Sequence, residues 1–488
     1  APWVPPETVA EFVNHLLDTR HTRVVHEAKT AQWTVNVSAQ AKNSVLNNQT
    51  WGLDRQNGTA EKLIEAALNQ RTPTIRSYDP ETKSRKPDPA LTERAADKQR
   101  AIRKEFERWA WDDVDRRESL LRIYNDTHNT DVERSYDGSH LTFPGSNPQI
   151  QLRDNQRNAA WRIIQDGRGL LHHVVGAGKT WTMVAAGMEM KRLGLAKKPM
   201  YVVPNHMVNQ FSKEFLELYS TANILTLGPE EVKAENRKRT ASRIATGDWD
   251  AVVVRESAFV RIPVSPEYET KFVEAQIKEL EWAIRQMEEQ EGGTKKGKSL
   301  VKRLEAIKDR KEARLKELSN RESKDQQITF EELGVDFMFV DEAHNFKNLE
   351  FQTKMQVAGL GQRQDVQKTL DMLMKVRYMQ ELHGGDKGVV FATGTPISNS
   401  IAEMYIQMRY LIPSELEAKG INHFDGWAVT FAEAEKEWEW SIDNKGYTER
   451  TRFRTFINIG DLAQLYRKFA DVIMPEDLPN VKLPKIKG

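Results

Sequence analysis

The sequence predicts an α/β protein built on a doubly wound, mostly parallel sheet, with an α+β region before it and an inserted helical hairpin. Three observations lead to this fold class. Apolar runs of strand length alternate with segments of helical periodicity, which is the pattern of a parallel sheet covered by helices. Several runs end directly in polar residues, as strands do at the carboxyl edge where such sheets bind ligands. One run, within 170–180, passes through a glycine-containing turn into a helix start.

The composition is that of a large folded protein without an extreme of charge. The chain has 488 residues, 39% of them hydrophobic, enough for two or three domains. Its formal net charge is +1, so any surface for nucleic acid has to be a local patch. The lack of cysteine excludes disulfides and thiolate metal sites. No apolar run approaches the roughly 20 residues of a membrane helix, and the first residues do not have the pattern expected of a secretory precursor. The first residue is not Met, which suggests a fragment or a processed piece.

Residues 1–148 are expected to form an N-terminal accessory domain. Helical spacing covers 7–17, and two short strand-like runs lie within 23–37. The segment 71–98 is rich in proline and charge and predicts a solvated loop. A helix over 101–124 carries basic and aromatic residues, which suit either a nucleic-acid surface or an ordinary helix with aromatics in the core.

The turn within 170–180 has the composition of a phosphate cradle. Glycines let the backbone wrap closely around an anion, and the following helix start adds partial positive charge. A lysine there can reach the β/γ-phosphates, and a threonine hydroxyl can ligate Mg²⁺. A glycine-rich turn with an incidental lysine is the plainer alternative, and His173 replaces the first glycine of the usual pattern. The expected ATP-binding residues are Gly176, Ala177, Gly178, Lys179 and Thr180.

Gln156 precedes a helix some 20 residues before the cradle. Its amide offers one donor and one acceptor together, which matches the Hoogsteen edge of adenine. A helix cap is the alternative. We expect the adenine near this residue.

A second motif places two carboxylates directly after a buried strand. The apolar run 337–340 leads into Asp341 and Glu342. Asp341, together with Thr180, is predicted to hold Mg²⁺, and Glu342 is predicted to polarise the attacking water. Acidic residues at an ordinary helix N-terminus are the alternative.

Together these motifs resemble a known family. Gly-Ala-Gly-Lys-Thr, Val-Val-Pro-Asn, Asp-Glu-Ala-His-Asn-Phe-Lys-Asn and Ala-Thr-Gly-Thr-Pro-Ile-Ser-Asn are similar, in order, to motifs of superfamily-two helicases. The Snf-type, chromatin-remodeller-like ATPases are the most similar group. Sequence stretches outside these motifs, including Pro-Trp-Val-Pro-Pro at the start, resemble the very large DarB-type antirestriction and mobile-element proteins, in which a methyltransferase precedes the helicase.

The resemblance implies a RecA-like helicase lobe over 149–474 that uses ATP and Mg²⁺ and moves on double-stranded DNA. It implies partners in a second RecA-like lobe and a methyltransferase domain, no membrane, and a place in the cytoplasm of a bacterial or phage-infected cell, or in a virion. His344, with Thr393 and Thr395, would couple nucleotide state to DNA. The candidates for DNA contact are Asn205, Lys347, Asn348 and Asn399.

The remaining segments complete the expected organisation. Residues 265–324 carry two amphipathic stripes around a glycine turn and predict a helical hairpin, either an arm for DNA or a partner or a spacer packing only on itself. A last helix is expected over 461–473, and 475–488 resembles a hinge toward an absent second lobe.

The motif Gln-x-x-Gly-Arg-x-x-Arg, with its catalytic arginine, does not occur. We therefore expect slow ATP turnover by this chain alone. An RNA helicase lobe and a non-catalytic, ATP-gated scaffold stay open as alternatives.

Overall fold

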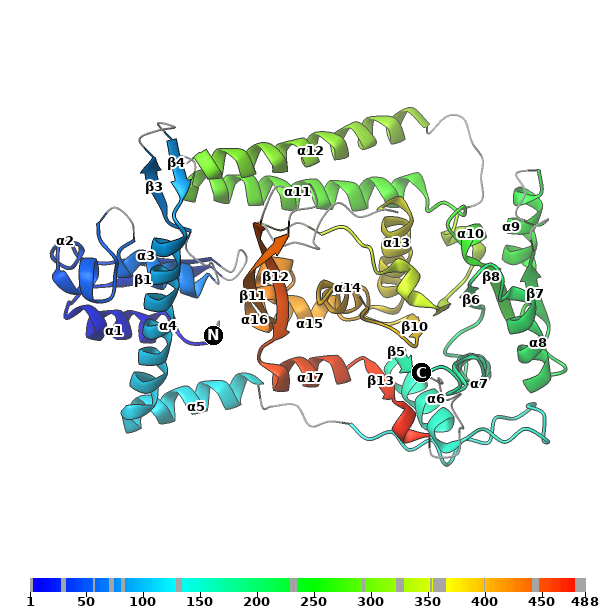
Figure 1. Ribbon diagram of the computed structural model, residues 1–488. Coiled ribbons are helices and arrows are strands. Elements are labelled where there is room, and N and C mark those ends of the chain that lie inside the picture. Colours follow the sequence, from blue (N-terminus) through cyan, green and yellow to red (C-terminus); the bar gives the residue numbers. More distant parts are fainter. Residues whose placement is uncertain are drawn as a thin grey trace.

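A seven-stranded parallel sheet organises the part of the protein that lies on the right in Figure 1, as the computed structural model shows. The structure describes residues 3–27, 32–55, 58–69, 74–79, 84–128, 134–228, 231, 235–291, 295–321, 329–351, 353, 366–398, 400–440 and 447–478. The strand order is β13-β5-β10-β9-β6-β8-β7, and every neighbouring pair is parallel. The strands are β5 (Arg168–His173), β6 (Pro199–Val203), β7 (Ile224–Leu227), β8 (Ala251–Arg255), β9 (Phe337–Asp341), β10 (Val389–Thr393) and β13 (Ala470–Ile473).

The sheet is covered on both faces, which confirms the predicted doubly wound, RecA-like α/β fold. Successive residues of a strand alternate between two apolar clusters: Met200 and Val202 belong to one, Tyr201 and Val203 to the other. Helices α6 (Asp154–Asp166), α7 (Lys179–Arg192) and α8 (Val208–Leu218) pack in the second cluster. The first cluster holds α10 (Glu256–Phe259), α13 (Val366–His383), α14 (Ala402–Leu411) and α16 (Phe424–Phe431).

The end of the sheet differs from the sequence prediction. A single helix over 461–473 is wrong, because α17 (Ile459–Arg467) ends first and β13 then joins the sheet beside β5. The Leu170 N–H donates to the Phe469 carbonyl at 2.7 Å, so the chain already pairs with β5 at this turn. Pairing with a distant strand therefore overrides the helical spacing of this segment.

The N-terminal region has an apolar core of its own, formed by residues between Val4 and Leu120. Its elements are α1 (Pro6–Leu17), β1 (Arg23–Glu27), β2 (Gln32–Asn36), α2 (Ala39–Lys42), η1 (Leu46–Thr50), α3 (Ala60–Leu68), β3 (Arg76–Asp79), β4 (Ser84–Pro87), α4 (Pro89–Asp112) and α5 (Val114–His128).

The solvated loop expected over 71–98 is wrong in part. Strands β3 and β4 pair there, and Asp88 begins α4 by accepting a hydrogen bond from the Leu91 N–H at 3.0 Å. Pro87 therefore ends β4, and Asp88 and Pro89 begin α4.

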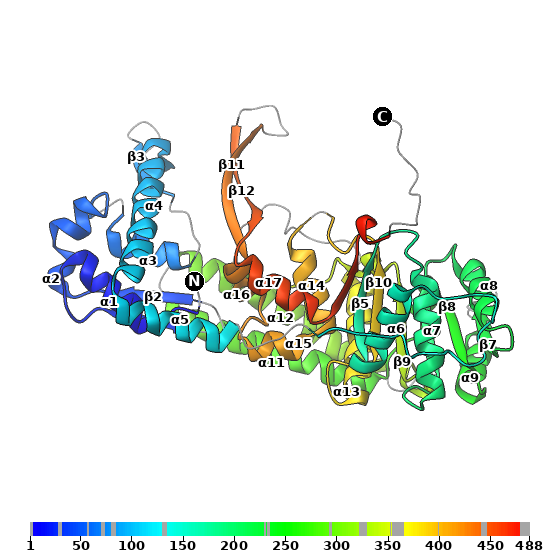
Figure 2. The ribbon, with the colours of Figure 1, turned by 90° about the horizontal axis from the view of Figure 1, so that it is seen from below.

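The predicted helical hairpin is present as α11 (Pro266–Glu291) and α12 (Lys295–Arg321), and it extends from the sheet toward the N-terminal region (Figures 1 and 2). Leu280, Val301 and Leu304 form its internal core. Its base packs on the main core through Tyr268 and Phe272. The alternative of a spacer that packs only on itself is therefore wrong.

A second projection, the antiparallel hairpin of β11 (Ala432–Trp440) and β12 (Tyr447–Phe456), leads from α16 to α17 (Figure 2). Two contacts tie the N-terminal region to this part: Tyr124 Oη lies 3.1 Å from Asp461 Oδ1, and Arg103 Nη1 lies 3.5 Å from Glu433 Oε1. Among the described helices, none is long and apolar enough to cross a membrane.

Candidate nucleotide site

The predicted phosphate loop joins the carboxyl end of β5 to the start of α7. Gly176 and Gly178 both have φ of 86°, a left-handed conformation that other residues rarely adopt. A side chain at Gly178 would also collide with the amide of Gln156. Helix α7 begins at Lys179 directly after this turn. The loop geometry therefore needs glycine at the two positions that the motif predicted.

Two side chains of α6 and its cap hold the loop carbonyls. Arg153 Nη2 donates to the carbonyl oxygens of Gly176, at 3.2 Å, and Ala177, at 2.7 Å. Gln156 Nε2 donates to the Gly178 carbonyl at 3.1 Å. Three consecutive carbonyls are thus satisfied on the α6 side of the loop, and the Ala177 N–H donates to the Val174 carbonyl at 3.1 Å. Sequence reasoning missed Arg153, although its place three residues before Gln156 was a usable signal.

Gln156 is the helix cap that the sequence left open as an alternative. Its Oε1 accepts a hydrogen bond from the Arg153 N–H at 2.9 Å, and the side chain is buried. Both ends of the amide are therefore engaged within the protein. Contact with adenine stays a prediction, because the side chain is buried and each end of its amide already has a partner within the protein.

Lys179 lies in the field of the predicted acid pair. Its Nζ donates to the His173 carbonyl at 3.0 Å. Burial lowers the pKa of Lys179, while the charges of Glu342 and Asp341 act in the opposite direction. The charges of the two carboxylates at the end of β9 therefore act on the lysine of the loop.

Asp341 is the last residue of β9 and is partly buried. Burial, reinforced by the neighbouring Glu342 charge, raises the pKa of Asp341 to about 6. Such a carboxylate gains from a nearby cation. Among the described residues no group of three His, Cys, Asp or Glu side chains could hold a metal by itself. The donors fit Mg²⁺, which usually takes one or two protein oxygens together with phosphate oxygens and water.

The predicted coupling residues meet at the ends of β9 and β10. Glu342 has a left-handed backbone, with φ of 48°. Its Oε2 lies 3.1 Å from His344 Nδ1, which in turn lies 3.0 Å from Thr393 Oγ1. Thr393 Oγ1 also accepts a hydrogen bond from the Thr395 N–H at 3.1 Å. The acid pair is therefore linked to the end of the neighbouring strand.

In the part of the chain that the structure describes, the hydrogen bonds of the candidates for DNA contact do not join these candidates to one another. Asn205 is exposed, and its Oδ1 accepts hydrogen bonds from the Ser257 N–H at 3.1 Å and from Arg255 Nε at 3.3 Å.

Lys347 is instead turned toward the protein interior. Its Nζ lies 3.3 Å from Glu403 Oε1 and also donates to Ser398. Asn348 is partly buried, and Asn399 lies outside the described residues.

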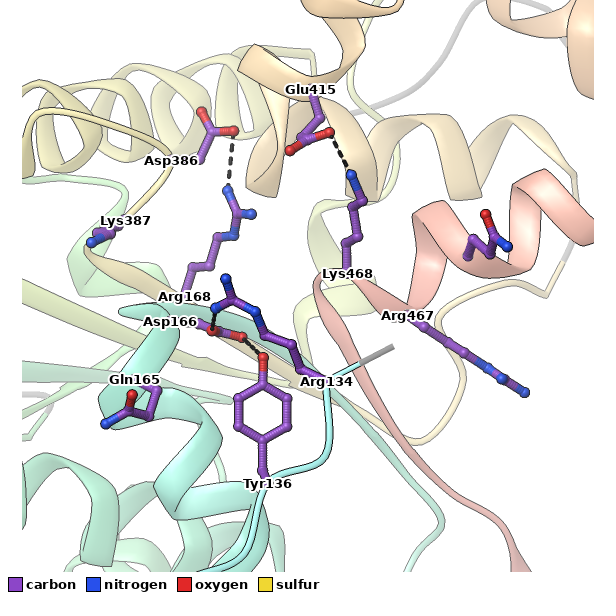
Figure 3. Close-up of a pocket in the computed structure, with 11 residues that line it drawn as sticks. Arg134, Tyr136, Gln165, Asp166, Arg168, Asp386, Lys387, Glu415, Arg467 and Lys468 are labelled. Carbon is purple, nitrogen blue, oxygen red and sulfur yellow. Dashed lines mark hydrogen bonds and ion pairs between the residues drawn. The ribbon is translucent and has the colours of Figure 1, made fainter. Parts of the chain in front are cut away.

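A separate cavity of about 580 Å³ lies at the opposite, amino edge of the sheet (Figure 3). Arg168, which begins β5, pairs there with Asp386 at 3.2 Å, and Lys468 pairs with Glu415 at 3.0 Å. Since the phosphate loop follows the other end of β5, this cavity is not part of the nucleotide site.

Two family sequence models match the chain. The model described as "Probable helicase domain" matches residues 161–473, and a "Domain of unknown function (DUF8437)" matches residues 1–130. The chain is 24% identical over 416 residues to "Defense against restriction protein B" of Escherichia phage P1. That match covers 76% of this chain and 18% of the phage protein, so the chain corresponds to a small part of its relative.

Solved structures of a Sulfolobus solfataricus SWI2/SNF2 ATPase core are also similar. The core in complex with dsDNA has a TM-score of 0.31 and 16% identity, over 57% of this chain and 39% of that one. The core domain alone has a TM-score of 0.28 and 12% identity, over 61% of this chain and 42% of that one.

Proposed function

The chain belongs to the helicase-domain family that matches residues 161–473, and from this we propose that it is the ATP-binding first lobe of an ATP-dependent double-stranded DNA translocase. The helicase resemblance of the motifs is confirmed by this family match. The observation that most supports nucleotide use is that Lys179, at the start of α7, lies close enough to Asp341 and Glu342, at the end of β9, for their charges to act on its pKa. A lysine from a phosphate loop and a carboxylate pair after a buried strand are the parts that phosphoryl transfer needs.

The proposed roles follow from the positions of the side chains. Lys179 and the loop N–H groups would bind the phosphates, while Arg153 keeps the loop carbonyls turned away from them. Asp341 and the Thr180 hydroxyl would hold Mg²⁺, which supplies Lewis acidity at the γ-phosphate. Glu342 would orient the attacking water, and the left-handed backbone at this residue sets the direction of its side chain. Gln156 would lie beside the adenine.

DNA would act through the ends of β9 and β10. The contacts of His344 with Glu342 and Thr393 support a coupling role, because a change at either strand end alters the hydrogen bonds around Glu342, the proposed general base. Asn205, Asn348 and Asn399 are proposed to face the DNA track. Lys347 could join them only by leaving Glu403, so we propose that it changes partner when DNA binds.

We also propose the organisation 1–148 as accessory domain, 149–474 as first lobe with the 265–324 hairpin inserted, and 475–488 as hinge. The separate apolar core of the N-terminal region supports the first division. A second lobe would supply the missing arginine motif, and a methyltransferase domain would belong to the same larger protein, in a bacterial or phage-infected cell. The low coverage of the phage relative, 18%, is compatible with such a parent.

A non-catalytic, ATP-gated scaffold is the second candidate, favoured by the lack of the arginine-bearing motif in the sequence. The deciding experiment has two steps. Mg·ATP binding to the 488-residue chain is measured by titration, and steady-state hydrolysis is then measured without nucleic acid, with duplex DNA and with RNA.

We expect binding with slow turnover by the chain, and duplex-stimulated hydrolysis once the second lobe is supplied in the same polypeptide. Stimulation by RNA alone would identify an RNA helicase, and binding without hydrolysis in the complete protein would identify a scaffold. No binding of Mg·ATP would contradict the proposal.

A further inference from the structure

A hydrogen-bonded pair, of which His173 is buried and Asp471 is partly buried, joins the last residue of β5 to the edge strand β13. His173 is fully buried, and its Nε2 lies 2.6 Å from Asp471 Oδ2. The other ring nitrogen, Nδ1, is buried and has no hydrogen-bond partner in the part of the chain that the structure describes. Asp471 is therefore the polar group that orients this ring. The contact lies directly before the phosphate loop, where Ile473 is the strand partner of His173.

Arg162 of α6 holds the same carboxylate from another side. Its Nη1 lies 3.5 Å from Asp471 Oδ1 and donates to the Ala470 carbonyl at 2.9 Å, and its Nη2 donates to the Arg467 carbonyl. Burial by itself would raise the pKa of Asp471, but the hydrogen bond from His173 and the charge of Arg162 hold that pKa below its ordinary value. Asp471 is thus an anion clamped between α6 and β5.

These contacts continue to the opposite edge of the sheet. Arg162 Nε lies 3.6 Å from Asp166 Oδ2, at the end of α6. The Tyr136 hydroxyl donates to Asp166 at 2.8 Å, beside the cavity (Figure 3). One connected set of charged and polar groups therefore runs along α6 from the amino edge to the phosphate loop.

The loop itself rests on both members of the strand pair. The Val174 N–H donates to the Ile473 carbonyl at 3.0 Å, and Ala177 packs against Ile473 and Leu478. The His173 carbonyl is the acceptor for Lys179 Nζ. A shift of β13 relative to β5 would therefore move the acceptor of the lysine and the wall behind the loop together.

We propose that Asp471 is a positioning residue for the phosphate loop. By holding His173 on one side and Arg162 on the other, it keeps β13 in register beside β5 and so sets the geometry in which Lys179 and the loop N–H groups meet phosphate. The inference rests on the proposed nucleotide site. It adds a residue almost 300 positions from the loop, far outside the motif that defines that site.

The test compares Mg·ATP and Mg·ADP affinities of the full chain and its Asp471→Asn variant by titration, with thermal midpoints recorded in parallel. We expect about tenfold weaker binding of both nucleotides, because one charge-assisted hydrogen bond that orders the loop is lost. Asp386→Asn is the control: Asp386 is also ion-paired, and it is buried, but it lies at the other edge of the sheet. It should lower the thermal midpoint without weakening nucleotide binding.

A double-mutant cycle shows whether Asp471 acts through His173. His173→Leu removes the hydrogen bond but leaves Arg162 and Asp471 paired, so it should reproduce the binding defect, and the double variant should bind no more weakly than either single one. His173→Leu also serves alone if Asp471→Asn does not fold. Multiplied effects in the double variant, or an Asp471→Asn protein that loses stability but binds ATP normally, would overturn the proposal and make Asp471 a structural partner of Arg162. A parent chain that binds no Mg·ATP would instead overturn the proposed function.

Discussion

Oε2 of Glu342 lies 3.1 Å from Nδ1 of His344, and the backbone of Glu342 itself is left-handed. The two side chains of one motif thus face each other. An extended or helical backbone at Glu342 would direct its side chain elsewhere. Backbone strain of this kind is typical of functional sites, where the surrounding structure enforces it. Here β9 ends at Asp341, and the 3-10 turn η3 (Ala343–Phe346) begins directly after Glu342.

Lys179→Ala should weaken Mg·ATP binding by roughly tenfold to hundredfold, the range expected for a lost charged hydrogen bond. Thermal stability should stay near that of the parent, because in the part of the chain that the structure describes Lys179 donates to a single acceptor, the His173 carbonyl. Titration calorimetry measures the affinity. Lys191→Ala is the control, since Lys191 lies at the far end of the same helix and pairs with Asp250 at 3.2 Å. Equal ATP affinities for parent and Lys179→Ala would exclude the loop as the phosphate site.

Glu342→Gln should separate binding from turnover. The amide keeps the size of the side chain and leaves Asp341 and Thr180 in place, so Mg·ATP should still bind. Hydrolysis by the complete, two-lobed protein should fall by about 10²–10⁴-fold, the usual contribution of a general base. Single-turnover hydrolysis in the presence of duplex DNA measures this step. Parent-like rates for the variant would show that another residue orients the water.

Asp341→Asn should stabilise the fold at neutral pH while weakening Mg²⁺-dependent nucleotide binding. Because the folded pKa is about 6, above the ordinary value of 3.8, the folded state binds the proton more tightly than the unfolded state does. Stability of the parent therefore falls as pH rises between these two values and stays lower above pH 6. The asparagine variant lacks this loss, which is worth up to about 3 kcal/mol for a shift of this size.

Thermal unfolding at pH 5 and at pH 7.5 checks this expectation. The gain of Asp341→Asn over the parent should be larger at pH 7.5. A gain that is equal at both pH values, or a loss at pH 7.5 only, would contradict a raised pKa for Asp341.

Two deletions in the helical hairpin should have opposite outcomes. Glu281 pairs with Lys308 at 2.8 Å, and nearer the base of the hairpin Glu269 pairs with Arg314 at 2.8 Å. Replacing 282–307 by a short Gly/Ser loop should leave the base intact and the thermal midpoint nearly unchanged. Replacing 265–324 should lower it strongly, because Tyr268 and Phe272 then leave the main core. Similar midpoints for the two deletions would show that the base contributes nothing to the core.

Local chemistry explains which features could be predicted. The phosphate loop needs glycine at Gly176 and Gly178 because the backbone has positive φ at both, and a tight turn of this kind is visible in the local motif. The acid pair was predictable because an apolar strand must end at the sheet edge, where Asp341 emerges. The helix predicted over 461–473 was wrong because the periodicity of a short segment contains no information about the strand beside which it lies.

The amino-acid sequence by itself determined the parallel α/β fold, the phosphate loop and the acid pair, since each depends on residue types at short spacing. Tertiary structure alone decided the partners of charged side chains. It places Lys347 against Glu403 rather than toward solvent, and it seats Asp471 beside His173. The physical reason is that a buried charge takes whichever opposite charge the packing of distant elements brings within hydrogen-bond distance, and sequence spacing does not record that neighbour.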